Sequence, residues 1–221
     1  MPENNNAISW AAAYYANTLA AYIMNSQPRI KAVFDSWKLQ GGTKETFLSN
    51  LQKNQEVKNI LLSESPWVME ARTEEEQKKR IATLFDLNNI RNNNIAALTR
   101  LKELQQSDGS WAWYKGMNGS RFITNFIVEL NARLALLTGK PLEGDALTMQ
   151  RSAFSFLNKE ALEEYKNIRK AEKNGEKVKG LSDEALKYLY LVAISGEKMP
   201  LADNQTAYNY FLSKVGETLT S

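Results

Sequence analysis

The sequence predicts an all-α fold, and three observations carry this prediction. Apolar residues recur at helical spacing along most of the chain. No convincing alternation of apolar and polar residues lies between turn dipeptides, so strands are not expected. Glycines gather in the connectors between the periodic stretches, where the backbone must turn. We therefore expect roughly nine to eleven helices, stacked as hairpins in a single domain over residues 1–221.

Three helices are expected in the first part of the chain. Thr43 and Thr73 stand where N-cap residues would, and Glu76 completes a capping box with Thr73. The asparagine-rich segment 88–98 is interpreted as a junction between helices, because Asn caps helices and accepts left-handed backbone. The apolar stripes of the three helices are Ile30, Val33, Phe34 and Trp37, then Phe47, Leu48 and Leu51, then Ile81, Leu84 and Phe85.

The strongest helical pattern lies in the second half of the chain. Its main stripe is followed by Gly139 and Pro141, which favour a helix end. Residues 186–194 are apolar over most of their circumference, so we expect this helix to be more buried than its neighbours. The charged segment 170–180 indicates a helix end followed by a loop. The expected stripes are Ala97, Leu98, Leu101 and Leu104; Ile123, Phe126, Ile127, Leu130, Leu134 and Leu137; Phe154, Leu157, Ala161, Tyr165 and Ile168; and Ala207, Phe211 and Val215.

The connector before the main stripe contains unusually large aromatic residues. Asp108 and Gly109 predict a tight turn, since Asp caps its own backbone and Gly accepts positive φ. If the following segment is extended, Trp111 and Trp113 face alike and cover the ends of adjacent helices. Ser120 or Asn118 could then cap the next helix. The alternative role for these aromatics is a stacking platform for a sugar or prenyl ligand, and packing is the favoured interpretation.

Composition excludes several kinds of chemistry. The chain has neither Cys nor His, so it cannot supply a thiolate nucleophile, a His general base, a Ser-His triad or a typical zinc site. Lys and Arg total 28 against 25 Asp and Glu, a net charge of +3, which gives no electrostatic argument for nucleic acid or an anionic membrane. No apolar run is long enough to cross a bilayer, and no signal peptide is recognisable. We expect no catalytic, cofactor-binding or metal-binding residue.

Carboxylates are the main catalytic groups left to consider. Asp108 and Glu129 are the candidates for a pair of acids like that of a glycosidase, although Asp108 has a turn role and Glu129 stands four residues before Arg133, as in an ordinary helix ion pair. The aspartate-rich clusters of terpene cyclases are absent. Five basic residues near the aromatic connector are interpreted as a solvated face, and a contact with an acidic partner is the alternative. They are Arg91, Arg100, Lys102, Lys115 and Arg121.

Two segments carry a resemblance to known proteins. The residues of the first are Gln105, Asp108, Gly109, Ser110, Trp111, Trp113, Gly116, Ser120, Ile123 and Thr124. This segment resembles a signature in the thioester-domain region of the α2-macroglobulin family, in which a sequence close to Asp-Gly-Ser-Trp precedes a helix. It also looks, more weakly, like the Gln-Trp motif of terpene cyclases. The second segment, residues 14–37, is similar to the helix just after the thioester motif in bacterial macroglobulins, in particular those of Bacteroides-type organisms.

The resemblance implies an α/α toroid, a complete or incomplete ring of stacked helix hairpins. The family's reactive motif, Cys-x-Glu-Gln, would fall at Asn6, Ala7, Ile8 and Ser9, where none of its reacting residues is present. The resemblance therefore implies a domain of a much larger bacterial protein that traps proteases, in which this domain is structural, contacts other proteins and makes no bonds. Its partners would be other domains of the parent chain and the trapped endopeptidase, in the periplasm, cell envelope or extracellular space.

Two other functions stay open. One is a carbohydrate-active or terpenoid-type enzyme that uses carboxylates on the same toroid. The other is a helical-repeat scaffold that binds peptides in a concave groove.

Overall fold

The computed structural model describes residues 5–26, 90–176, 180–195 and 204–219. Within these residues the chain forms six helices and no strand, which confirms the all-α prediction. Two isolated β-bridges, both made by Trp111, add to the helices. The helices expected between residues 28 and 85 lie outside the described residues.

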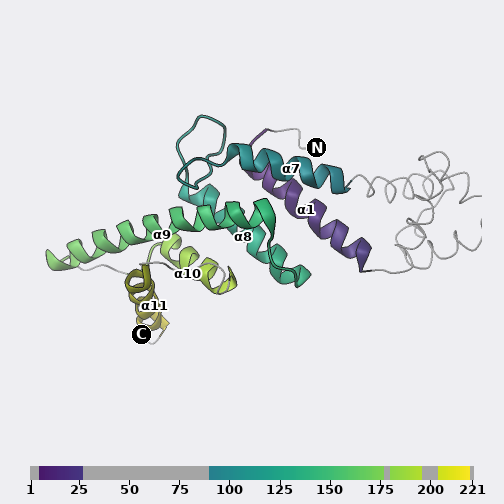
Figure 1. Cartoon of the computed structure of the whole chain (residues 1–221). Helices are drawn as coiled ribbons and strands as arrows, with labels where there is room; N and C mark the ends of the chain where they lie inside the picture. Colours follow the sequence, from purple (N-terminus) through teal and green to yellow (C-terminus); the bar gives the residue numbers. More distant parts are fainter. Residues whose placement is uncertain (1–4, 27–89, 177–179, 196–203, 220–221) are drawn as a thin grey trace, which may run out of the picture. The chain divides into compact units, whose positions relative to one another are not determined.

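Figure 1 labels the helices of the described part in their order along the chain. They are α1 (Ala7–Asn25), α7 (Ile90–Leu104), α8 (Arg121–Thr138), α9 (Gly144–Lys173), α10 (Asp183–Ser195) and α11 (Gln205–Leu219). By its internal contacts the chain divides into two compact units. One contains Met1–Tyr15 and Ala96–Ser221, and the other contains Ala16–Ile95. None of the described helices is both long enough and apolar enough to cross a membrane.

The ends of α8 follow the predicted capping residues. The Ser120 hydroxyl accepts a hydrogen bond from the backbone N–H of Ile123, and Gly139 closes the helix in left-handed backbone with φ of 64°. The buried face differs from the expected stripe at one end, because Leu137 is 56% exposed. The buried positions include polar residues instead, among them Thr124 and Asn131.

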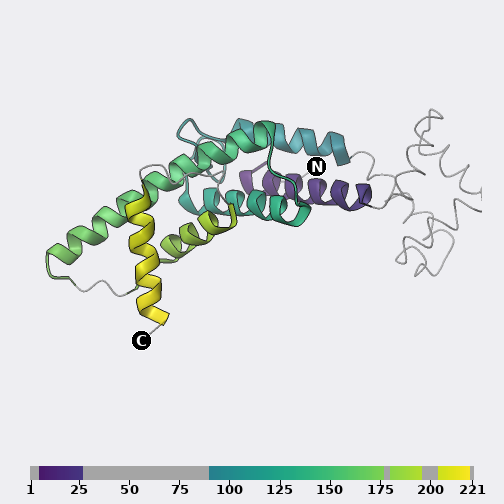
Figure 2. The same ribbon diagram turned by 60° about the horizontal axis from the view of Figure 1, so that its bottom comes forward.

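Helices α8, α9 and α10 of the larger unit pack against one another (Figures 1 and 2). Arg121, at the start of α8, pairs with Glu164, far along α9, whereas Asn131 contacts Gln150 near the start of α9. These contacts make α8 and α9 antiparallel, as expected for a hairpin with a short connection. Along α10 the pairings with α8 run in the same order, from Asn125 with Glu184 to Glu129 with Lys187, so α8 and α10 are parallel.

The C-terminal helices differ in part from expectation. Only Ala185, Tyr188 and Leu191 of α10 are buried, while Leu186 and Tyr190 are exposed. The expectation that residues 186–194 form an especially buried helix is therefore wrong, because α10 packs with one face only. In α11, Ala207 and Phe211 are buried as predicted. This helix packs against α9 and α10, and its axis runs across that of α9 in both views (Figures 1 and 2).

The asparagine-rich segment is not a junction over the residues described. Residues 90–98 lie inside α7, and residues 88 and 89 fall outside the described part. Asn94 accepts a hydrogen bond at 3.0 Å from the hydroxyl of Thr18 in α1, within the smaller unit. This Asn therefore joins two helices through its side chain, a role that leaves helical backbone undisturbed.

Candidate functional site

Residues 105–120, here called the Trp111 loop, connect α7 to α8. The loop folds back on itself through backbone hydrogen bonds. The Gln106 N–H donates to the Ser110 carbonyl at 2.8 Å, and the Ser120 N–H donates to the Trp111 carbonyl at 2.9 Å. Both ends of the loop, Gln105 and Ser120, pair with Trp111, which lies between them.

The tight turn predicted at Asp108 and Gly109 is confirmed. A carboxylate oxygen of Asp108 accepts from the backbone N–H of Ser110 at 2.9 Å and from its hydroxyl at 2.7 Å. The hydroxyl of Ser110 is the main reason that the pKa of Asp108 is lowered. Gly109 has a φ of 91°, and a Cβ there would lie 2.1 Å from the carbonyl oxygen of Ser152 in α9. Only glycine fits at this position, because both the backbone angle and the space exclude a side chain.

The side chain of Gln105 connects the turn to helix α9. Its amide Nε2 donates to the carbonyl of Gly109 at 3.0 Å and to the carbonyl of Met149, in α9, at 2.9 Å. One side chain therefore holds both the loop and a neighbouring helix. This contact gives a physical reason for the Gln that begins the motif.

Trp111 is fully buried and serves the packing role favoured from the sequence. Its indole Nε1 donates to the carbonyl of Leu101 in α7 at 2.9 Å, and its backbone N–H donates to the hydroxyl of Thr124 in α8 at 2.9 Å. The same hydroxyl donates to the carbonyl of Ser120 at 2.8 Å. Trp111 thereby links the end of one helix to the start of the next.

Trp113 does not share the burial of Trp111, so the expectation that both tryptophans cover helix ends is wrong for Trp113. Its side chain is 44% exposed, because the backbone bends at residue 113 and the alternation of an extended strand stops there. Tyr114 and Met117 are also about half exposed, at 50% and 54%. We call Trp113, Tyr114 and Met117 the aromatic tip of the loop.

The other motif residues have distinct positions. Gly116 has a φ of 88° with open space where a Cβ would stand. Ser120 caps α8, and Ile123 is buried on its first turn. Every residue of the sequence motif is thus accounted for by turn geometry, capping, burial or the exposed tip.

The start of α1 meets the Trp111 loop. The backbone N–H of Ala7 donates to the carbonyl of Trp113 at 3.2 Å, within the larger unit. Asn6 is 6% exposed and caps the helix, because its side-chain oxygen accepts from the backbone N–H of Ser9 at 2.8 Å. Residues 6–9, where the family's reactive motif would fall, therefore form the cap and first turn of α1 beside the motif loop.

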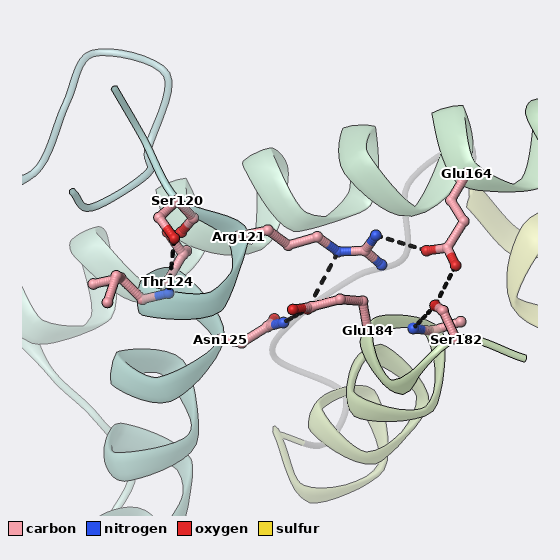
Figure 3. Close-up of polar contacts among 9 residues, drawn as sticks. Ser120, Arg121, Thr124, Asn125, Glu164, Ser182 and Glu184 are labelled. Atoms are coloured by element: carbon pink, nitrogen blue, oxygen red, sulfur yellow. Dashed lines mark hydrogen bonds and ion pairs between the residues drawn. The ribbon is translucent and has the colours of Figure 1, made fainter. Parts of the chain in front are cut away.

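A polar cluster, which the sequence did not predict, lies immediately after the loop (Figure 3). Arg121 pairs with Glu164 at 2.6 Å, and both side chains are less than a fifth exposed. Ser182 donates to Glu164 and caps α10 by accepting from the N–H of Ala185. Asn125 donates to Glu184 at 2.5 Å, and Glu184 also lies 3.8 Å from the Nε of Arg121.

This cluster corrects the interpretation of Arg121 as part of a solvated basic face. Instead, its guanidinium joins α8 to α9 and α10. Other polar contacts between the helices were also not predicted. For example, the side-chain oxygen of Gln150 accepts from Asn131, and its side-chain nitrogen donates to the carbonyl of Val128. The available signal was the spacing: Thr124, Asn131 and Thr138 recur at seven-residue intervals on the face that also carries buried apolar residues.

The candidate acids have structural partners. Glu129 lies 2.8 Å from Arg133 in the predicted helix ion pair, and it also pairs with Lys187 of α10. The lowered pKa of Asp108 is the opposite of what a general acid requires. Lys102 pairs with Asp145 at 2.7 Å, and Arg100 pairs with Glu103 at 2.7 Å, both on exposed surfaces, as interpreted from the sequence. In the described ranges, no three His, Cys, Asp or Glu side chains gather to form a candidate metal site.

Comparison of the chain with models of protein families, with curated proteins and with solved structures finds no significant match.

Proposed function

We propose that this chain is a non-catalytic domain of an α2-macroglobulin-like protein that traps endopeptidases. It corresponds to the thioester-domain region of that family, with the reactive motif lost. The observation that carries the proposal is the hydrogen bond from Ala7 to Trp113. It joins the place where the reactive motif would fall to the loop that resembles the family's signature, two segments about a hundred residues apart in sequence.

The chemistry of residues 6–9 supports a structural role. An internal thioester needs a thiol and a glutamine amide, and this chain has no Cys at any position. Asn6 uses its side chain to cap α1, and Ala7 is fully buried without a functional group. We therefore propose that these residues position the first helix against the Trp111 loop, and that the domain contributes no covalent step to protease capture.

The aromatic tip is the surface that we propose for protein contact. Trp113, Tyr114 and Met117 lie together in one short loop and expose large apolar side chains, which are costly to leave in water. Aromatic residues and Met are enriched at protein interfaces, and Trp and Tyr dominate their binding energy. The proposed occupant is another domain of the same protein, as the resemblance to the macroglobulin family implies.

Three of the helices, α8, α9 and α10, have the order expected of the ring, whereas α11 runs across α9 (Figures 1 and 2). In an α/α toroid, antiparallel hairpins stack side by side, so alternate helices are parallel. The antiparallel pair α8 and α9, followed by α10 parallel to α8, has this order. We propose that these helices are part of such a ring, in a protein of the periplasm, cell envelope or extracellular space.

The reading frame of the gene around this segment provides the test. The proposal expects one continuous frame that encodes further domains of macroglobulin type on both sides of these residues. No other position in that frame should carry a Cys-x-Glu-Gln motif. A frame that encodes this segment alone, or a complete Cys-x-Glu-Gln motif elsewhere in the same protein, would contradict the proposal.

A further inference from the structure

The sequence contains two Asn-Gly pairs, Asn118–Gly119 in the Trp111 loop and Asn174–Gly175 at the end of α9. An Asn followed by Gly can lose its side-chain amide without an enzyme. The backbone nitrogen of the Gly loses its proton and attacks the side-chain carbonyl carbon of the Asn. A new C–N bond closes a five-membered succinimide, and the side-chain nitrogen leaves as ammonia. Water then opens the ring at either carbonyl and gives aspartate or isoaspartate.

The two pairs differ in how tightly their backbone is held. The Gly175 N–H donates to the carbonyl of Glu172 at 3.0 Å, and the Asn174 N–H donates to the carbonyl of Ala171 at 3.0 Å. This hydrogen bonding fixes the attacking nitrogen of Gly175 in the C-terminal cap of α9 and engages its proton. Ring closure at Asn174 therefore requires the helix end to open first.

The backbone nitrogen of Gly119 in the loop pair carries no such hydrogen bond in the described part of the chain. Both Asn118 and Gly119 are exposed, and within the described part of the chain neither takes part in a hydrogen bond. The nitrogen of Gly119 is thus available to attack, and a Gly has no Cβ to obstruct the approach. The two pairs share the same chemistry, so this difference in hydrogen bonding sets their relative rates.

The flanking residues determine what the reaction would do to the fold. On one side, the Met117 carbonyl accepts from the side chain of Gln106 at 2.7 Å. On the other, the Ser120 N–H donates to Trp111 and the Ser120 hydroxyl caps α8. Gly119 itself is pressed against Ser110, because a Cβ on Gly119 would lie 2.0 Å from the Ser110 hydroxyl oxygen.

We propose that Asn118–Gly119 is a site of spontaneous deamidation, and that its isoaspartate product loosens the Trp111 loop at the start of α8. Isoaspartate adds one methylene group to the main chain, between two points that the fold holds in place. It also adds a negative charge. The added length displaces Ser120 from Trp111 and weakens the cap of α8, whereas the ordinary aspartate product keeps the length of the main chain.

The test follows both pairs in the folded protein during incubation in mildly alkaline buffer. Mass spectrometry of the peptides that span residues 118 and 174 measures the conversion of amide to acid, and chromatography separates isoaspartate from aspartate. We expect Asn118 to convert several-fold faster than Asn174 in the folded chain, and the two rates to converge in denaturant. Equal rates in the folded chain, or faster conversion of Asn174, would overturn the assignment.

Two variants separate the reaction from its effect. Asn118→Gln should abolish conversion at this position, because the larger ring closes much more slowly, and the incubated variant should keep its original unfolding midpoint. Asn118→Asp introduces the charge without lengthening the main chain. The isoaspartate form of the native protein should unfold at lower denaturant concentration than Asn118→Asp. If the two unfold at the same midpoint, the proposed effect on the loop is wrong even where the modification occurs.

Discussion

The indole of Trp111 caps the C-terminus of α7, because its Nε1 donates to the carbonyl oxygen of Leu101 at 2.9 Å. Leu101 is one of the last four residues of the helix, whose carbonyls lack the usual partners. The N–H of Gln105, its expected helical partner, donates instead to Lys102. A buried tryptophan thus satisfies a carbonyl that would otherwise be hidden from water without a hydrogen bond.

Replacing Trp111 tests this cap. Trp111→Phe keeps an aromatic ring but removes the donor, and it should lower the free energy of unfolding by about 1–3 kcal/mol from the unsatisfied carbonyl alone. Trp113→Phe changes a side chain that is 44% exposed and should stay within about 0.5 kcal/mol of the native protein. Urea titration followed by circular dichroism measures both. Equal losses for the two variants would contradict the different roles of the two tryptophans.

Gly109 and Gly116 form a matched pair. Both have positive φ, of 91° and 88°, but only Gly109 lies against backbone of another helix. Gly116→Ala should cost about 1 kcal/mol from the strained angle. Gly109→Ala adds a collision with Ser152 and should cost at least about 2 kcal/mol more, in the range of overpacked cores. Similar unfolding free energies for both variants would mean that the loop does not press on α9 as described.

The largely shielded ion pair of Arg121 should matter more than an exposed one. Arg121→Met leaves the Glu164 carboxylate, which is 17% exposed, without its cationic partner, and should destabilise the fold by roughly 3 kcal/mol. Arg100→Met removes an exposed pair with Glu103 and should change stability by less than about 1 kcal/mol. A cycle with Glu164→Gln isolates the coupling between the two side chains. Additive effects of Arg121→Met and Glu164→Gln would show that the pair does not interact.

Asp108 gives the turn a dependence on pH. Its folded pKa is lowered, chiefly by the hydroxyl of Ser110, so its contribution is present above the unfolded pKa of about 4 and is lost as pH falls through the folded value. The stability difference between the native protein and Asp108→Asn should therefore be constant near neutral pH and shrink in acid. In a Ser110→Ala background, the change with pH should be smaller. Denaturation at a series of pH values checks this, and a difference that grows in acid would contradict it.

The helical part of the fold could be predicted where local signals agree. The ends of α8 follow from Ser120 and Gly139, since caps depend on residues next to the helix end. The turn at Asp108 and Gly109 is equally local. Side-chain burial around α8 was harder, because Leu137 fits the apolar stripe but finds no partner, being 56% exposed. Burial depends on which neighbour covers each face, and no local pattern contains that information.

The candidate site could also be predicted only in part, for the same reason. The motif residues from Gln105 to Trp111 were identified, but the bend at Trp113 depends on how the loop closes against Ser120 and the start of α1. The role of Arg121 depends on Glu164, forty-three residues away. A charged residue whose partner is so distant in sequence is predicted to be exposed to solvent, because the sequence does not identify the partner. For the same reason the sequence of residues 88–98 predicts a helix junction, whereas Asn94 lies inside α7 and accepts a hydrogen bond from Thr18 of α1.

The protease assay of the complete gene product tests the central claim most directly. The protein is incubated with an endopeptidase, and residual activity is measured on a large protein substrate and on a short peptide substrate. A trap without a thioester should suppress cleavage of the protein substrate, leave cleavage of the peptide nearly unchanged, and form no protease adduct that survives denaturing electrophoresis. Unchanged cleavage of both substrates, or an adduct that survives denaturation, would contradict the account.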